Sequence, residues 1–269
     1  MPQTKTALAK TLGISRSSLY YRPKRPGRDW SLKIRIEEAL HEHPSYGSRR
    51  LALELRKNRK QVQRVMQVFG IHPYRRRPKR KHYGRGSPIV PYENLLLAIS
   101  FPVLPNLVWV SDFTHVVFRG MILYIATVMD LCTREILGWH ALLGHPTELV
   151  LGAFTDAVRR AGTAPEILHS DQGSEYTSKR YTATLEEQRI RISMSRKGSP
   201  WENGYQESFY SQFKLDLGSP ERFDSLGELI VAIAEHLHRY NHTRIHTALK
   251  MPPAAFAERH RSKVETSVT

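Results

Sequence analysis

The order of apolar runs between residues 107 and 241 restricts the fold of this chain more than any other feature of the sequence. Three strand-like runs come first, and a turn centred on Gly120 joins the first two. Helical and strand-like runs then alternate. Strands are expected at 107–117, 122–129, 135–142, 166–170 and about 190–195, and helices at 147–161, about 178–188, about 200–216 and about 225–241. This order predicts an α/β domain in which helices flank a mixed sheet.

Positive charge is concentrated at the N-terminal end. Residues 1–83 hold 22 Lys and Arg against 5 Asp and Glu, which leaves 19 basic and 20 acidic residues for the rest of the 269-residue chain. A basic block beside a nearly neutral one indicates two functions, one of which is to hold a polyanion. Nucleic acid is the expected polyanion, because neutralising its phosphates releases counterions and drives binding.

The basic block has helical patterning. Residues 4–21 predict two short helices separated at Gly13, the second capped by Ser15, in a small helix-turn-helix pattern. Residues 29–71 predict three more, at about 30–42, at about 48–57 and between a capping Asn58 and a terminating Gly70. Inward-facing side chains are expected at Ala7, Leu8, Leu12, Leu19, Tyr20, Leu32, Ile34, Ile36, Leu40, Leu51, Leu53, Leu55, Val62, Val65, Met66 and Phe69.

The three-helix segment has two interpretations. It is either a plain three-helix bundle or a second, DNA-binding helix-turn-helix, and basic side chains on its last helix favour the second. Arg59, Lys60 and Arg64 are therefore expected to contact DNA. The run RRRPKRK (75–81) cannot pack into a core and predicts a linker along a DNA backbone. Its expected phosphate contacts are Arg75, Arg76, Arg77, Lys79, Arg80 and Lys81.

These features divide the chain into five expected parts. They are a helix-turn-helix-like segment (1–28), a helical DNA-binding domain (29–72), a basic and Pro-rich linker (73–104), a catalytic α/β domain (105–258) and a disordered tail (259–269). The lone Cys132 makes no intrachain disulfide and fits a reducing compartment. The sequence lacks a long apolar run and a signal-peptide pattern at its start, so we expect a cytoplasmic protein.

Three carboxylates stand where a site can form. Asp112 lies inside an apolar strand, where an unpaired carboxylate is costly. Asp171 directly follows the fourth strand, and open sheets place ligands at strand carboxyl ends. Glu207 lies within a helix. Carboxylates that crowd one point repel one another unless a cation lies between them, and Mg²⁺ suits such oxygen ligands. Two such ions support phosphodiester cleavage or transfer.

Other acidic residues nearby have local interpretations. The run SPWE (199–202) predicts a capping box that uses Glu202, with proline at the first helical position. Asp130 is expected to form a turn, and Glu175 to serve locally. Asp112 and Asp171 could also be a strand-edge acid and a turn former, but the presence of both beside Glu207 favours the site.

Several polar residues keep two interpretations. His115 is expected on the strand face opposite Asp112, and His169 is either buried or a neighbour of the site. Asn203 either orients the helix of Glu207 or a DNA strand, or is an ordinary polar residue at the N-terminus of that helix. Lys214 either contacts phosphate or is a solvated or salt-bridged lysine. The residues that follow the last long helix either touch DNA or form a structural corner. These are His242, Arg244 and His246.

Longer stretches carry a family resemblance. They are WVSDFTHV (109–116), DLCTREILGWH (130–140), LHSDQGSEY (168–176), SMSRKGSPWENGYQESFYSQFK (193–214) and YNHTRIHTAL (240–249). With HPSYGSRRLALEL and NRKQVQRVM near the N-terminus, they resemble second-frame transposases of the insertion-sequence-three family, relatives of retroviral integrases. The resemblance covers about residues 12 to 256. It departs from many relatives at Pro200, Trp201 and Glu202, in a variable loop.

The resemblance implies a ribonuclease-H-like catalytic domain whose acidic triad corresponds to Asp112, Asp171 and Glu207, with two Mg²⁺ ions, or Mn²⁺ in their place. It implies a DNA transposase that binds element ends and transfers a 3′-hydroxyl to a phosphodiester. It also implies a bacterial, nucleoid-associated protein that forms a homo-multimer on DNA, and an upstream-frame partner protein. Two alternatives stay open: a catalytically idle, DNA-binding regulator, and a ribonuclease-H-like nuclease on RNA–DNA hybrids.

Overall fold

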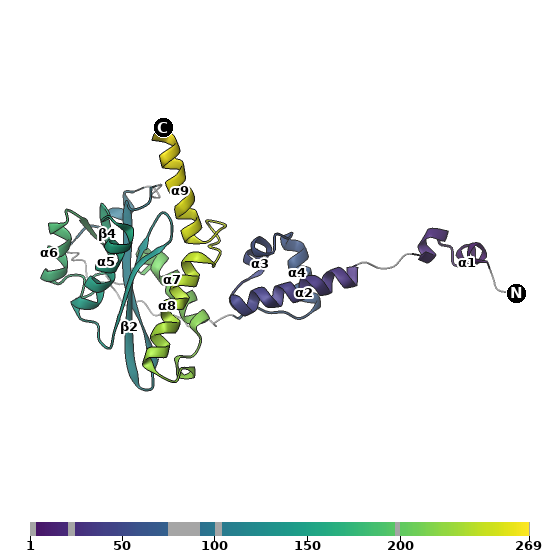
Figure 1. Ribbon diagram of the computed structural model, residues 1–269, viewed down its shortest axis with the longest axis horizontal. Coiled ribbons are helices and arrows are strands. Elements are labelled where there is room, and N and C mark those ends of the chain that lie inside the picture. The colour runs from purple at the N-terminus through teal and green to yellow at the C-terminus, as the bar shows by residue number, and fades with distance from the viewer. Residues whose placement is uncertain (1–3, 21–24, 75–91, 100–103, 197–199, 269) are drawn as a thin grey trace.

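The structure is a computed structural model that describes residues 4–20, 25–74, 92–99, 104–196 and 200–268 (Figure 1). Its strands are β1 (Val108–Phe118), β2 (Met121–Asp130), β3 (Ile136–Leu142), β4 (Ile167–Ser170) and β5 (Arg191–Met194). Its α-helices are α1 (Lys5–Thr11), α2 (Arg25–Glu42), α3 (Ser48–Glu54), α4 (Arg59–Val68), α5 (Thr147–Ala161), α6 (Lys179–Glu187), α7 (Gly204–Leu217), α8 (Leu226–His242) and α9 (Pro253–Val268). Its 3₁₀ helices are η1 (Arg16–Tyr20), η2 (Leu95–Leu97), η3 (Pro200–Asn203) and η4 (Pro220–Arg222).

The five strands form one mixed sheet in the order β3-β2-β1-β4-β5. The first three strands pair antiparallel, whereas β4 pairs parallel with both β1 and β5. The expected mixed α/β sheet is confirmed, with each strand within two residues of its predicted bounds. The expected helix at 200–216 differs in one respect, because it begins with η3 before α7.

The β1–β2 hairpin has a two-residue turn at Arg119 and Gly120, as the sequence predicts. Phe118 pairs with Met121 across it. Both turn residues have positive φ, 47° and 79°, which matches the right-handed twist of the flanking strands. Glycine adopts this conformation without steric cost, which explains the turn signal at Gly120.

Helices cover both faces of the sheet (Figure 1). Side chains alternate along β1, so Val108 and Val110 pack against α7 and α8, whereas Trp109 packs on the opposite side against α5. The two cores are therefore separated by the sheet itself. The face covered by α7 and α8 becomes important below, because α7 carries Glu207.

Helices α2, α3 and α4 enclose a third core that contains Ile36, Leu51 and Val62. The Asn58 side chain caps α4 by accepting a hydrogen bond of 2.8 Å from the Lys60 backbone N–H, as expected. Two of the expected core residues are wrong: Ile34 is 41% exposed and Leu53 37% exposed. Each lies two positions from a buried leucine, about 200° around its helix, so it faces away from the core.

The expected helix pair at 4–21 is only partly correct. Gly13 breaks it with a φ of +63°, and Ser15 caps the second element, but that element is the short 3₁₀ helix η1. The prediction that five side chains of this segment face inward is wrong for all but the half-buried Leu19. Within the described residues, α1 and η1 lack a third element against which they could bury a shared apolar face. The exposed residues are Ala7, Leu8, Leu12 and Tyr20.

Two expectations about irregular chain are also corrected. Within the expected linker 73–104, residues 92–99 contain η2, and the Leu95 backbone N–H donates to Ser193 Oγ of β5 at 2.9 Å. The basic run 75–81 lies outside the described residues. The expected disordered tail 259–269 is helical as far as Val268, because α9 is rich in strong helix formers and begins at a proline.

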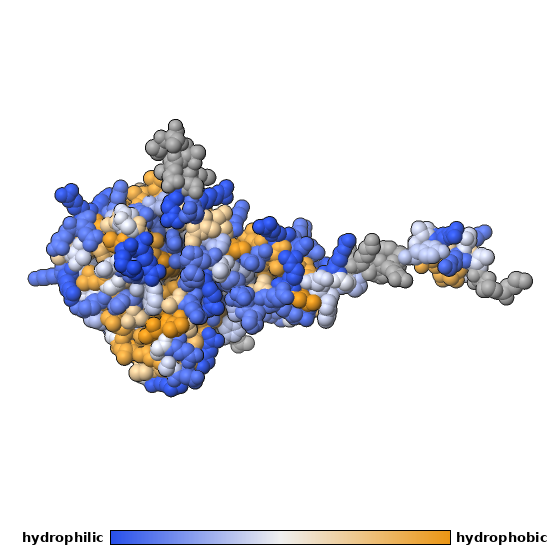
Figure 2. Space-filling model, viewed as in Figure 1, coloured by the Kyte–Doolittle hydropathy of each residue, from blue (hydrophilic) through white to orange (hydrophobic). Residues whose placement is uncertain are grey.

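Apolar surface is visible on the lower part of the sheet unit in Figure 2. The β1–β2 hairpin contributes exposed apolar side chains at its end, among them Val117, Met121 and Ile122. Among the helices that the structure describes, none is both long and apolar enough to cross a membrane.

Candidate carboxylate active site

The parallel pairing of β1 and β4 directs two of the expected carboxylates to the same end of the sheet. The last pair in this register joins Val110 to His169. Asp112 and Asp171 each lie two residues past this last pair, Asp171 just beyond the end of β4, so the register continued by two residues would set them opposite each other. One strand pair thus relates two positions that are 59 residues apart in the sequence.

Asp112 is half-buried on β1 and is held by its own backbone and by α7. Its Oδ1 accepts a hydrogen bond of 2.8 Å from the Phe113 N–H, and its carbonyl oxygen accepts one of 2.6 Å from the Tyr210 hydroxyl. Burial raises the pKa of Tyr176 well above its usual value, and the charges of Asp112 and Asp171 raise it further. Tyr176 therefore lies close to both carboxylates.

Asp171 begins a tight turn directly after β4. Its Oδ1 accepts a hydrogen bond of 2.9 Å from the Gly173 N–H. A Cβ at position 173 would lie 2.7 Å from Glu175 Oε2 and 3.1 Å from Asp171 Oδ1, so a side chain there would require the Glu175 carboxylate to shift. Burial raises the pKa of Asp171, the Gly173 hydrogen bond lowers it, and the charge of Glu175 raises it again; the balance is upward.

Helix α7 carries Glu207 to the same strand. Gln206 Nε2 donates to the Val110 carbonyl oxygen at 2.8 Å, and Asn203 Nδ2 donates to the Ser111 carbonyl oxygen at 3.4 Å. Together with the Tyr210 bond, these contacts fix the first turns of α7 against the segment of β1 that ends in Asp112. Glu207 is half-buried and follows Gln206 by one residue, so it lies beside this anchored face.

The three carboxylates lie on neighbouring elements but do not form a compact ligand cluster. Among the described residues, no group of three or more His, Cys, Asp or Glu side chains gathers closely enough to hold a metal ion. The donor chemistry still fits a divalent cation, because hard carboxylate oxygens are the ligands that Mg²⁺ prefers. Asp171 is half-buried and is repelled by the charge of the buried Glu175, and a bound cation would offset that repulsion.

The competing acids have structural partners. Glu202 accepts hydrogen bonds of 2.8 Å from Asn94 Nδ2 and from the Arg196 backbone N–H. Its role is therefore structural, and it connects η3 to the segment that contains Asn94. Ser199, its expected capping-box partner, lies outside the described residues. Asp130 is buried and accepts from the Asn106 and Thr133 backbone N–H groups, which confirms a turn. Glu175 is bonded to His145 Nδ1.

The polar residues that the sequence left open are now placed. His169 is fully buried with its Nδ1 2.8 Å from Ser193 Oγ, and burial lowers its pKa to about 4, so it is a neutral core residue. His115 is exposed, in agreement with its expected outward face. Its pKa is lowered by partial burial and then by the charge of Lys214, which places that lysine near β1. Asn203 is buried and orients α7.

The expected DNA contacts are placed only in part. Arg59, Lys60 and Arg64 are exposed on α4, but Arg64 also bonds both carboxylate oxygens of Asp29, at 2.7 and 2.5 Å, and so ties α4 to α2. Lys214 is half-buried on α7. The remaining six lie outside the described residues: Arg75, Arg76, Arg77, Lys79, Arg80 and Lys81.

The segment after α8 forms a structural corner around Arg244. This arginine is 5% exposed and donates to Asp216 Oδ2 at 2.7 Å, to Gln212 Oε1 at 2.8 Å and to Ser45 Oγ at 3.2 Å. His246 belongs to the same corner, whereas His242 is exposed and packs on His238. Sequence reasoning missed the partners of Arg244, because local periodicity does not connect positions on different helices.

Comparison with protein families identifies the integrase core domain. One form of this domain matches residues 102–200 and a second form matches residues 188–253. Together they span the sheet and helices α5 to α8, which include all three carboxylates.

Relatives extend the similarity to almost the whole chain. A transposase for insertion sequence element IS904 of Lactococcus lactis is 34% identical over 226 residues, covering 81% of this chain and 89% of the relative. A putative transposase for element IS150 of Escherichia coli is 32% identical over 257 residues, covering 90% and 89%.

A solved structure supports the fold. A chain of the simian T-cell lymphotropic virus intasome, determined by cryoEM with the PP2A regulatory subunit B56 gamma, matches with a TM-score of 0.53 and 18% identity. The match covers 81% of this chain and 73% of that one. It confirms the ribonuclease-H-like fold that the sequence predicts. With its integrase core domain and its extended similarity to insertion-element proteins, the chain belongs to the family of insertion-sequence transposases.

Proposed function

We propose that this protein catalyses strand cleavage and strand transfer at the ends of a DNA element, with Asp112, Asp171 and Glu207 as its catalytic carboxylates. The observation that supports the proposal is the parallel pairing of β1 with β4, whose register ends two residues before Asp112 and Asp171, together with the anchoring of α7 on β1. The reaction would expose a 3′-hydroxyl by hydrolysis and then use it to attack another phosphodiester.

Asp112 and Asp171 would hold divalent cations, and Glu207 would complete the shell of the second. Mg²⁺ is the expected ion and Mn²⁺ an accepted substitute. When bound, such ions activate the attacking oxygen and stabilise the leaving oxygen of an in-line displacement. The protein itself orients the carboxylates. Tyr210 and Gln206 bond the backbone carbonyls of Asp112 and Val110, on either side of Ser111, and so hold Asp112 in a fixed position relative to α7.

Basic side chains would place the DNA. Lys214 lies two turns after Glu207 on nearly the same face of α7, where an ammonium group can contact a phosphate next to the scissile one. Arg59, Lys60 and Arg64 on α4 and the basic run 75–81 would contact the backbone further along. Phosphate contacts of this kind fix register and orientation but not sequence.

The proposed assembly is a homo-multimer on two DNA ends, with an upstream-frame protein as a further partner for end recognition. Its support is the family membership and the charge distribution, since the N-terminal block holds the whole excess of positive charge.

The proposal is tested by scission of supercoiled plasmid in Mg²⁺ or Mn²⁺. Wild type is compared with Glu207→Gln and with Glu187→Gln, which changes an exposed glutamate on α6 by the same chemistry. We expect wild type and Glu187→Gln to cut, and Glu207→Gln to bind DNA without cutting. Equal cutting by all three would reject the triad. Binding without cutting by wild type, also with element ends and the upstream-frame protein, would indicate an idle DNA-binding regulator.

A further inference from the structure

Helix α7 begins without a capping side chain. Its N-cap residue Asn203 makes no side-chain capping hydrogen bond, and its first residue, Gly204, is a weak helix former. The Asn203 amide instead donates to the Ser111 carbonyl oxygen at 3.4 Å. Glu207 is the fourth residue of α7, so it follows directly on a turn that would fray by itself.

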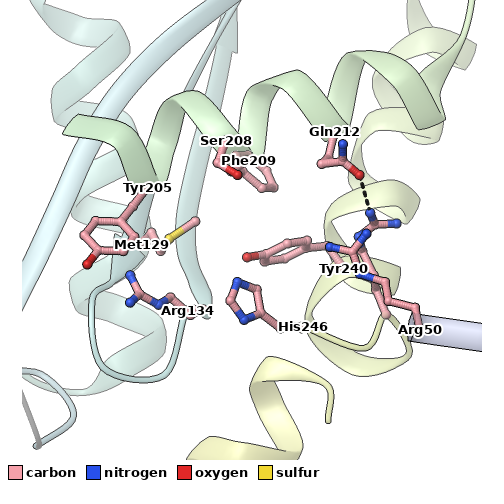
Figure 3. A pocket seen from close by; sticks show the side chains of 10 residues that line it. Arg50, Met129, Arg134, Tyr205, Ser208, Phe209, Gln212, Tyr240 and His246 are labelled. Atoms are coloured by element: carbon pink, nitrogen blue, oxygen red, sulfur yellow. Dashed lines mark hydrogen bonds between the residues drawn. The ribbon is translucent and has the colours of Figure 1, made fainter. Parts of the chain in front are cut away.

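The body of α7 is held on both of its sides. Toward β1, Gln206 and Tyr210 bond backbone carbonyls. On the opposite side α7 lines a small pocket, where Gln212 Oε1 accepts a hydrogen bond of 2.8 Å from Arg244, drawn as the dashed line in Figure 3. Three arginines line this pocket: Arg50, Arg134 and Arg244. The uncapped start is therefore the part of the helix that needs support from outside.

Glu202, one residue before the N-cap, is tied down by several hydrogen bonds. Its Oε2 accepts from the Arg196 backbone N–H and from Asn94 Nδ2, and its Oε1 accepts from Arg196 Nε, all at 2.8 Å. The side chain is 2% exposed. Burial raises the pKa of Glu202, but the hydrogen bonds from Arg196 and Asn94 and the charge of Arg196 outweigh this effect, so the pKa is lowered. Bonds to an ionised carboxylate are stronger than neutral ones.

The groups that hold Glu202 are themselves fixed to the sheet. Asn94 Oδ1 accepts from the Leu96 N–H at 3.0 Å, and the neighbouring Leu95 N–H donates to Ser193 Oγ of β5 at 2.9 Å. Arg196 follows β5 by two residues. Glu202 thus connects η3, and through it the first turn of α7, to the edge strand of the sheet.

We propose that Glu202 is a positioning residue for Glu207, because its bonds to Asn94 and Arg196 order the start of α7. The inference rests on the proposed function, since a displaced Glu207 slows scission only if this carboxylate is catalytic. It assigns the positioning to the paired geometry of Asn94 and Glu202, and not to the charge of Glu202 alone.

The first test is amide hydrogen exchange of the full chain without DNA or added metal. Asn94→Asp places a second carboxylate against Glu202, where the amide had donated, and the two repel. We expect amides at the start of α7 to exchange about tenfold faster, since a hydrogen bond to a charged group is lost. Amides of α8 should be unchanged, which verifies that the variant is folded.

A swapped pair tests whether geometry is restored. Asn94→Asp combined with Glu202→Gln exchanges amide and carboxylate between the two positions and re-forms their hydrogen bond in the opposite direction. Exchange should return most of the way to wild type, although the Arg196 N–H loses its acceptor. The matched control is Glu187→Gln combined with Gln188→Glu, which swaps the same groups between two exposed neighbours and should change nothing.

The second test measures plasmid scission by the same proteins. At saturating DNA, Asn94→Asp should lower the rate per folded molecule about tenfold and leave the DNA concentration for half-maximal rate unchanged, since the loss concerns the reacting carboxylate and not DNA binding. The swapped pair should recover most of the rate.

Two results would overturn the inference: unchanged exchange at the start of α7 in Asn94→Asp, or faster exchange there with a wild-type scission rate. Absence of scission in wild type would count against the proposed function. Exchange alone would then decide whether Glu202 orders the start of α7.

Discussion

The two sides of α7 serve neighbours of opposite chemistry. On the side of the carboxylates, neutral groups such as Gln206 and Tyr210 hydrogen-bond to β1 backbone. On the other side, Gln212 and Asp216 bind Arg244, which also reaches Ser45 of the N-terminal helices. Neutral hydrogen bonds therefore position the acidic site, whereas a buried charge network joins the helical unit to the sheet unit.

The largest effect is expected on the carboxylate side. Asp112→Asn and Asp171→Asn should lower plasmid scission at least about 1,000-fold, because the oxygens proposed to hold the cations lose their charge. Asp171→Asn should at the same time keep or raise the Tm in metal-free buffer, since burial disfavours the charged form of this group. Scission and thermal unfolding of the same preparations check both. A large fall in Tm would assign Asp171 to structure instead.

On the arginine side we expect a large loss of stability instead. Arg244→Ala should lower the free energy of unfolding by about 3–5 kcal/mol, because Asp216 is left as a buried carboxylate without its ion-pair partner. Denaturant unfolding measures the change. Arg239→Ala, which removes an exposed arginine five residues earlier, is the matched control and should change it little. A loss below about 1 kcal/mol would mean that water replaces Arg244 at this corner.

Tyr46 near Arg244 and Tyr210 near Asp112 allow the two sides of α7 to be compared by the same substitution. The Tyr46 hydroxyl accepts from the Ile245 N–H at 2.6 Å, and the Tyr210 hydroxyl donates to the Asp112 carbonyl at 2.6 Å. Each hydrogen bond lost in a Tyr→Phe change should cost about 1–3 kcal/mol of stability. Tyr210→Phe should cost more than Tyr46→Phe, because the Tyr210 hydroxyl also bonds Thr127 Oγ1 at 2.8 Å. Only Tyr210→Phe should also slow scission per folded molecule. Equal activity of the two variants would show that Tyr210 does not position Asp112.

The smallest expected effect is that of mild acid. His43 and His236 lie near Arg244 and have a pKa of about 4, in both cases first because burial disfavours the charged ring. A depressed folded pKa means that the unfolded state binds more protons below about pH 6.5, so stability is lost as pH falls. Between pH 7 and 6, the 6%-exposed His236 should cost on the order of 0.5–1 kcal/mol.

Denaturant unfolding at the two pH values measures this loss. His236→Gln should reduce the difference between pH 7 and pH 6, whereas His41→Gln, which changes an exposed histidine of α2, should not. A pH difference that is unchanged in His236→Gln would assign the acid sensitivity to other groups.

The sequence predicted the elements of the sheet unit well. The apolar run of β1, the Gly120 turn and the 147–161 helix are local patterns, and each agrees with the structure. It was less accurate at 4–21 and 259–269, where helix length and burial depend on partners that local patterns do not reveal. Asp112, Asp171 and Glu207 were picked out by their strand and helix positions and by resemblance.

What the sequence determined by itself was the family, the order of elements and the identity of the candidate carboxylates. The tertiary structure alone paired β1 with β4 next to the positions of Asp112 and Asp171, turned Gln212 and Asp216 toward Arg244, and gathered Arg50, Arg134 and Arg244 around one pocket. The two kinds of information differ in the sequence distance over which the underlying interactions act. Hydrophobic period, caps and turns act over a few residues, whereas register between strands and contacts between helix faces join positions far apart in the chain.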